Sequence, residues 1–213
     1  MDPNKQWWIE ERAKKAIDKL VAHDFKAICV KSKAEAAEEI GKHVTPKQTI
    51  GVGGSVTIRE LEILERLEAQ GHAIFDHWKP GISKEESLKI RKTQESCDLF
   101  LTSANAITLN GEIVNIDGFG NRIAAMTFGP GEVIIVAGKN KIVKDLPEAI
   151  ARIKDFVAPM NAKRFGADTP CVKTGRCVDC DSPQRICRGT LILERKPFGT
   201  DMLVMIVMED LGY

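Results

Sequence analysis

Short apolar segments alternate with amphipathic segments along most of this chain, and this alternation limits the folds open to it. Apolar runs typical of buried strands occupy 25–30, 48–54, 72–78, 98–104 and 132–138. Apolar residues at helical spacing fill the start of the chain and 32–44, 55–71, 83–96 and 146–165. Such alternation predicts an α/β fold, a mostly parallel sheet with helices on both faces. Two last strands, at 190–197 and 201–213, are expected to form a pair that reaches back to the sheet.

We divide the chain of 213 residues into two parts on this pattern. Residues 1–166 form the predicted α/β domain. Residues 167–213 form a segment rich in cysteine, followed by C-terminal strands that complete the domain. The length is sufficient for one sizeable hydrophobic core with an appendage.

The composition is that of a globular protein that needs neither nucleic acid nor a membrane. Hydrophobic residues make up 43% of the chain, charged residues 29%, and the net charge is +1. No apolar run approaches the ~20 residues needed to span a bilayer. The N-terminal segment lacks the apolar core of a secretory signal, so we expect a cytoplasmic protein. Trp7 and Trp8 in that segment favour packing or a homodimer contact over chemistry.

The first glycine-rich loop, "GVGGSVTIRE" (51–60), joins the end of a strand to the start of a helix. Ligands of open α/β sheets bind at the carboxyl ends of strands, where backbone N–H groups and hydroxyls can hold an anion. The predicted binding residues are Gly53, Gly54, Ser55 and Thr57. The alternative is a tight turn in which Ser55 only caps the helix. The loop matches neither the nicotinamide-dinucleotide motif nor the P-loop motif.

The second loop lies within 102–146 and combines several amides with two opposite charges. Asn105, Asn110, Asn115, Asp117 and Arg122 could together bind a polar ligand without a metal. The alternative is a hairpin whose Asn side chains bond to the turn backbone. Four amides, counting one more at position 121, and an arginine exceed what one turn needs, so we favour a binding site.

Basic side chains at two strand ends leave two interpretations open. His77 follows Asp76 at the end of a predicted strand, where it could act as a base or be a hydrogen-bonded structural residue. Lys139 and Lys141 follow a buried strand and could meet a phosphate, although a solvated loop explains them equally well.

Four of the six cysteines cluster near the C-terminus, at Cys171, Cys177, Cys180 and Cys187. Four thiolates suit either a tetrahedral Zn²⁺ or an iron–sulfur cluster, [4Fe–4S]. Only one C-x2-C pair is present, and the irregular remaining spacing modestly favours the cluster. Disulfides are disfavoured in a reducing cytoplasm. We therefore predict a metal site with these four residues as ligands.

Several segments together resemble the lactate-utilization (LUD) domain family, formerly a domain of unknown function, and within it the lactate-utilization protein C group. They are "GVGGSVTIRE", "TSANAITLNGEIVNIDGFGNRIAA", "FGPGEVIIVAGKNKIV" and "TPCVKTGRCVDCDSPQRIC". The resemblance implies the fold of glucosamine-6-phosphate deaminase, ribose-5-phosphate isomerase and CoA transferases. Some family members belong to a three-protein system that oxidises L-lactate, so it also implies other lactate-oxidation subunits as partners.

The run "SANAITLNGEIVNIDGF" also resembles, more distantly, the methylthioribose-1-phosphate isomerase family. Asn105 stands where that family has its catalytic Asp, and an amide cannot accept and return a proton. Three functions follow as hypotheses. The first is a LUD-domain protein that binds a small anionic metabolite in lactate or related organic-acid metabolism. The second is an iron–sulfur redox or assembly subunit of a lactate-oxidising complex, and the third is a sugar-phosphate isomerase.

Overall fold

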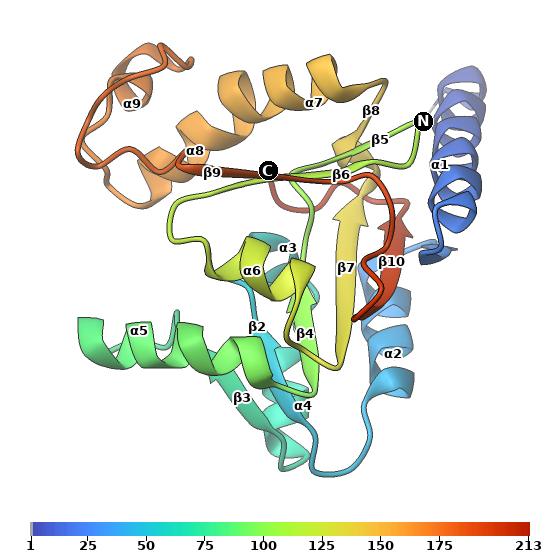
Figure 1. Ribbon diagram of the computed structural model, residues 1–213. Helices are drawn as coiled ribbons and strands as arrows, with labels where there is room; N and C mark the ends of the chain where they lie inside the picture. Colours follow the sequence, from blue (N-terminus) through green and yellow to red (C-terminus); the bar gives the residue numbers. More distant parts are fainter. Residues whose placement is uncertain (1) are drawn as a thin grey trace.

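The protein is built around a six-stranded, fully parallel sheet with strand order β1-β10-β7-β4-β2-β3. The computed structural model describes residues 2–213 (Figure 1). The strands are β1 (Lys26–Val30), β2 (Thr49–Val52), β3 (Ala73–Asp76), β4 (Leu99–Thr102), β7 (Glu132–Gly138) and β10 (Asp201–Val207). The predicted α/β fold is therefore confirmed.

Helices cover both faces of this sheet because its central strands are apolar on both sides. One face carries α1 (Pro3–Ala22) and α6 (Asn121–Thr127), and the other carries α2 (Lys33–His43), α3 (Val56–Glu60) and α4 (Leu64–Ala69). Along β7, Val133 and Ile135 pack on the first face, whereas Ile134 and Val136 pack on the second. This alternation follows from the two-residue repeat of a strand.

A second, four-stranded sheet lies across the carboxyl ends of the first (Figure 1). Its order is β8-β5-β6-β9, formed by β8 (Ile142–Val143), β5 (Ala106–Thr108), β6 (Ile113–Asp117) and β9 (Gly189–Leu193). Its outer side is covered by α7 (Leu146–Arg152) and the π-helical turn η3 (Ile153–Val157), which continue into α8 (Ala158–Arg164). The remaining elements are α5 (Lys84–Thr93), α9 (Pro170–Thr174) and the 3-10 turns η1 (Gln94–Ser96) and η2 (Lys139–Lys141).

Two local expectations are wrong. The last two strands do not pair with each other: β9 joins β6 in the small sheet, while β10 lies between β1 and β7 in the large one. Residues 202–207 are all apolar and buried, so they need neighbours on both edges and both faces. The helix expected over 55–71 is divided into α3 and α4, and Glu62 between them has a φ of 53°.

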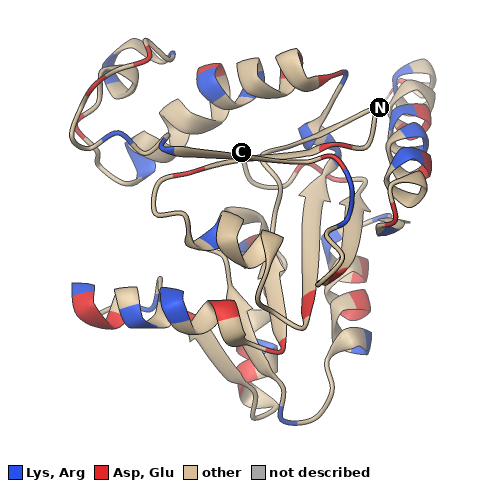
Figure 2. Ribbon diagram, viewed as in Figure 1, with Lys and Arg blue, Asp and Glu red and all other residues tan. Residues whose placement is uncertain are grey.

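The charged residues lie mainly outside the central strands. Figure 2 shows both signs of charge interspersed along α1 and α5, in keeping with the small net charge. Within residues 2–213, no helix combines the length and apolarity that crossing a bilayer requires. Trp7 and Trp8 are both more than half exposed on α1. The homodimer contact suggested for these two residues stays a prediction.

Candidate functional site

A cavity of about 450 Å³ lies between the carboxyl ends of the large sheet, the small sheet, α8 and the cysteine segment (residues 171–187). We call it the site cavity. Most of the residues predicted to bind a ligand line it, namely Gly53, Gly54, Ser55, Thr57, Asn105, Asp117 and Arg122. Asn110 and Asn115 do not line it. The two loops that the sequence singled out thus meet at one place.

The backbone of the first glycine loop lies so close to neighbouring side chains that residues larger than glycine do not fit there without a shift. A Cβ on Gly53 would lie 2.8 Å from Thr102 Oγ1, and one on Gly54 would lie 2.8 Å from His77 Nε2. Gly54 also has a φ of 66°, which disfavours any side chain. Ser55 caps α3, since its Oγ accepts a hydrogen bond from the backbone N–H of Ile58 at 3.3 Å. The loop therefore has a structural role and still borders the cavity.

Lys141 is the most unusual group in the cavity wall. Its Nζ donates hydrogen bonds to Thr57 Oγ1 at 2.7 Å and to Ser103 Oγ at 2.9 Å. Burial, together with the nearby charges of Arg152 and Arg122, lowers the pKa of this amine to about 7, while Glu60 opposes the shift. At neutral pH the amine therefore exists in both protonation states.

Arg122 holds the second loop together from inside the cavity. Its guanidinium donates to the carbonyl oxygen of Ile116 at 2.7 Å and to Asn105 Oδ1 at 3.3 Å. Its backbone N–H donates to Asp117 Oδ2 at 3.1 Å. Burial lowers the pKa of Arg122, and the charge of Asp117 opposes this shift. Among residues 2–213, no carboxylate lies within ion-pair distance of the side chain of Arg122 or of Lys141.

The amide side chains of the second loop form hydrogen bonds with the loop's backbone. Asn115 Oδ1 accepts from the backbone N–H of Asn105 at 2.9 Å, and Asn105 Oδ1 accepts from that of Ile116 at 2.9 Å. Asn115 is fully buried, and Asn110 sits in the turn between β5 and β6, where its N–H donates to Thr108 Oγ1. Asn105 alone of the three also reaches the cavity.

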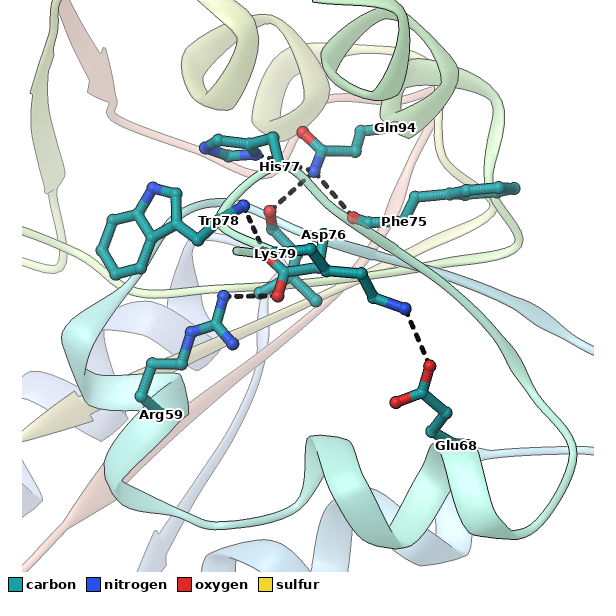
Figure 3. A network of polar contacts seen from close by, with 9 residues as sticks. Arg59, Glu68, Phe75, Asp76, His77, Trp78, Lys79 and Gln94 are labelled. Carbon is teal, nitrogen blue, oxygen red and sulfur yellow. Dashed lines mark hydrogen bonds and ion pairs between the residues drawn. The ribbon is translucent and has the colours of Figure 1, made fainter. Parts of the chain in front are cut away.

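His77 is buried and lines the cavity, and Figure 3 shows its ring beside Gln94. Burial lowers the pKa of His77 to about 4, and the charge of Arg91 adds to the effect. Gln94 Nε2 lies 3.0 Å from His77 Nδ1 and also donates to the carbonyl oxygens of Val52 and Phe75 at 2.8 Å. The two N–H groups of this amide match the two carbonyl oxygens, and Nε2 of His77 faces Gly54.

Trp78 forms an aromatic part of the wall between two arginines. The guanidinium of Arg164 lies 4.2 Å from the Trp78 ring centroid, and that of Arg59 lies 5.3 Å from it. Arg59 also pairs with the buried carboxylate of Asp76 at 2.6 Å (Figure 3). These contacts fix the position of the indole.

Several lining residues escaped the sequence analysis, notably Trp78, Ser103 and Arg164. Ser103 directly follows β4, so the rule that ligands bind at the carboxyl ends of strands could have identified it. Arg164 carries no such signal, because α8 reaches the cavity only through tertiary packing.

The four clustered cysteines lie together beside the site cavity. Cys171, Cys177, Cys180 and Cys187 all line a second cavity of about 20 Å³, which we call the thiol cavity. Burial raises the pKa of Cys187, and negative charge on the other three would raise it further. As placed, no set of three or more His, Cys, Asp or Glu side chains within residues 2–213 has the geometry to hold a metal ion. The predicted metal therefore stays a prediction.

The amino-acid sequence of the chain matches the model of a known family. The model of the LUD domain matches residues 13–208, nearly the whole chain. The chain belongs to the LUD domain family. The LUD domain thus includes the large sheet, both site loops and the cysteine segment.

Among solved structures, this LUD domain is similar to a DUF162 family protein from Deinococcus radiodurans. The TM-score is 0.55 at 16% identity, over 93% of this chain and 98% of that one, which shows a shared fold. Ribose 5-phosphate isomerase A from Neisseria gonorrhoeae also matches, with a TM-score of 0.36 and 19% identity over 54% of each chain. No curated protein matches the chain at a significant level.

Proposed function

We propose that this LUD-domain protein binds a small anionic metabolite in the site cavity and takes part in lactate or related organic-acid metabolism. One observation carries the proposal: the buried amine of Lys141 and the part-buried guanidinium of Arg122 both line the cavity, and among residues 2–213 neither has an ion-paired carboxylate. Burying a charge without a partner is costly, and an anionic ligand would offset that cost.

The neighbouring polar groups suit a carboxylate or phosphate. Ser55, Thr57 and Ser103 place hydroxyls in the wall, and a guanidinium such as that of Arg122 can form two parallel hydrogen bonds to a carboxylate. The volume of about 450 Å³ is in the range of small-molecule sites. The family's link to lactate utilization makes a 2-hydroxy or 2-oxo acid the first choice of ligand.

Within this proposal, Lys141 is the residue equipped to accept or return a proton. A group transfers protons best when its pKa lies near the working pH, and burial brings the pKa of Lys141 to about 7. Asn105 is not suited to this role, because its amide oxygen already accepts from Ile116 and Arg122. We therefore do not propose the sugar-phosphate isomerase reaction. The proposal places the protein in the cytoplasm, beside other lactate-oxidation subunits.

Isothermal titration calorimetry with lactate, pyruvate and inorganic phosphate tests the proposal, with lactamide as the uncharged analogue of lactate. We expect at least one anion to bind and lactamide not to bind. Arg122→Gln should weaken binding by about ten- to hundred-fold, the loss typical of a charged hydrogen bond. Arg195→Gln is the matched control, since Arg195 is exposed, donates hydrogen bonds to Ala22 and Asp24, and does not line the site cavity.

Two results would count against the proposal. Failure of all three anions to bind would remove the anionic-metabolite assignment. Equal affinities of Arg122→Gln and the wild type would remove Arg122 from the site. Circular dichroism of each variant shows whether the fold is retained, because Arg122 also bonds to the backbone of Ile116.

A further inference from the structure

We infer that Cys171, Cys177, Cys180 and Cys187 together bind a thiophilic metal centre, a single Zn²⁺ or a [4Fe–4S] cluster, in the wall of the site cavity. All four side chains line the thiol cavity, although they come from separate parts of the cysteine segment. Cys171 lies in α9, and the other three cysteines follow it in a stretch of the chain that forms no helix or strand. Four convergent thiols in a segment with so little regular structure are typical of a metal site.

The backbone at the C-x2-C pair already has the turn that such sites use. The N–H of Asp179 donates to Cys177 Sγ at 3.3 Å, and Asp179 has a φ of 46°. The hydroxyl of Thr169 lies 3.2 Å from Cys171 Sγ, close enough for a hydrogen bond. Contacts of this kind orient and stabilise thiolate ligands. Two of the four sulfurs therefore have outer partners in place.

Hydrogen bonds from Arg185 connect several residues of the cysteine segment around the thiols. Its guanidinium donates to the carbonyl oxygens of Cys180 at 2.7 Å and Cys187 at 2.8 Å, and pairs with Asp179 at 2.9 Å. A centre with four thiolates carries excess negative charge, which a nearby guanidinium partly offsets. Arg185 therefore stabilises both the turn and the charge of the proposed centre.

Metal binding requires the sulfurs to move inward, because no three of them yet stand in metal-binding geometry within residues 2–213. Three of the four cysteines lie in the irregular chain from Gly175 to Arg188, where no helix or strand opposes such a movement. At the end of that chain the backbone N–H of Arg188 donates to the carbonyl oxygen of Asp117 in β6 at 3.0 Å, which holds the start of β9 at Gly189 in place.

The proposed centre is also connected to the ligand site. Arg185, Ile186 and Cys187 line both the thiol cavity and the site cavity. A metal that fixes Cys187 would thereby fix one wall of the site cavity. This second step rests on the proposed function. The metal itself would not contact the anion, but its removal would leave this wall unfixed and should weaken anion binding about ten-fold or more.

Metal analysis and a UV–visible spectrum of the anaerobically purified protein test the centre directly. We expect either about one zinc per chain and no colour, or about four irons with sulfide and a visible absorption band. Cys177→Ser and Cys180→Ser should each lose most of the metal, whereas Cys29→Ser, at an exposed thiol outside the segment, should retain it.

The inference is overturned if the wild type holds no stoichiometric metal after purification and after reconstitution with zinc or with iron and sulfide. Retention of full metal content by both serine variants would also overturn it. Because metal content is measured without any anion, its result is independent of the proposed function. Anion titration of the metal-loaded and metal-free protein then tests the connection, and equal affinities would refute it.

Discussion

Lys141 Nζ and Thr57 Oγ1 lie 2.7 Å apart, which joins the turn after β7 to the helix after β2 at the centre of the site cavity. The two residues are 84 positions apart in the chain. Lys141 is only 4% exposed, and its closest polar partners are hydroxyls rather than carboxylates. The contact therefore keeps an amine with a lowered pKa next to two hydroxyl groups.

Lys141→Met should flatten the dependence of stability on pH above neutrality. The pKa of Lys141 is lowered from 10.5 to about 7 in the folded protein. Between these values the unfolded chain binds one more proton, so wild-type stability gains up to about 1.4 kcal/mol per pH unit from this group as pH rises. Urea unfolding at several pH values from 7 to 10 measures the difference between the two proteins. Lys139→Met is the control, and equal slopes for Lys141→Met and wild type would contradict the prediction.

His77 should remain neutral in mildly acidic solution. Burial lowers its pKa to about 4, so the folded protein resists a protonation that the unfolded chain accepts below about 6.5. Stability from this group is full above that value and is lost as pH falls toward 4. Imidazole nitrogen shifts in an NMR spectrum at pH 5 should be those of a neutral ring. A doubly protonated His77 ring at that pH would refute the assignment.

Gly54→Ala should destabilise the protein more than Gly81→Ala. Both glycines have positive φ, 66° and 80°, so both substitutions bear the same kind of backbone strain, about 1–2 kcal/mol. A Cβ at Gly54 would also lie 2.8 Å from His77 Nε2, whereas one at Gly81 would meet nothing within 4 Å. Denaturant unfolding of the two variants isolates the cost of the contact. Equal losses would mean that the loop and His77 can separate freely.

Two ion pairs of similar length near β3 should differ widely in their contribution to stability (Figure 3). Arg59 pairs with Asp76 at 2.6 Å, and Lys79 pairs with Glu68 at 2.7 Å. The Asp76 side chain is only 6% exposed, while that of Glu68 is 58% exposed.

Arg59→Met should therefore cost about 3 kcal/mol, because it leaves a buried carboxylate without its partner. Lys79→Met should cost at most about 1 kcal/mol, since its pair is screened by water. Thermal and urea unfolding of both variants at low salt provide the comparison. A small loss for Arg59→Met would show that Asp76 is satisfied by the N–H of Trp78, which it already accepts at 2.9 Å.

The sequence by itself determined the class of fold and part of the site. A strand buried on both faces must be apolar throughout, so β7 was identified with the bounds it has in the structure. The glycine loop was also identified, because the carboxyl end of a strand and the glycines that follow it are local features. Both features depend on residues that are adjacent in the chain, so they can be identified from the sequence alone.

Only the tertiary structure decided the strand order and the full composition of the cavity. β10 lies between β1 and β7, although 62 residues separate it from β7 and more separate it from β1. Lys141, Ser103 and Thr57 meet for the same reason, since they come from three separate segments. Such contacts follow from packing between distant parts of the chain. The apolar or polar character of a residue indicates that it will be buried or exposed, but the neighbour it meets is set by the arrangement of whole sheets and helices.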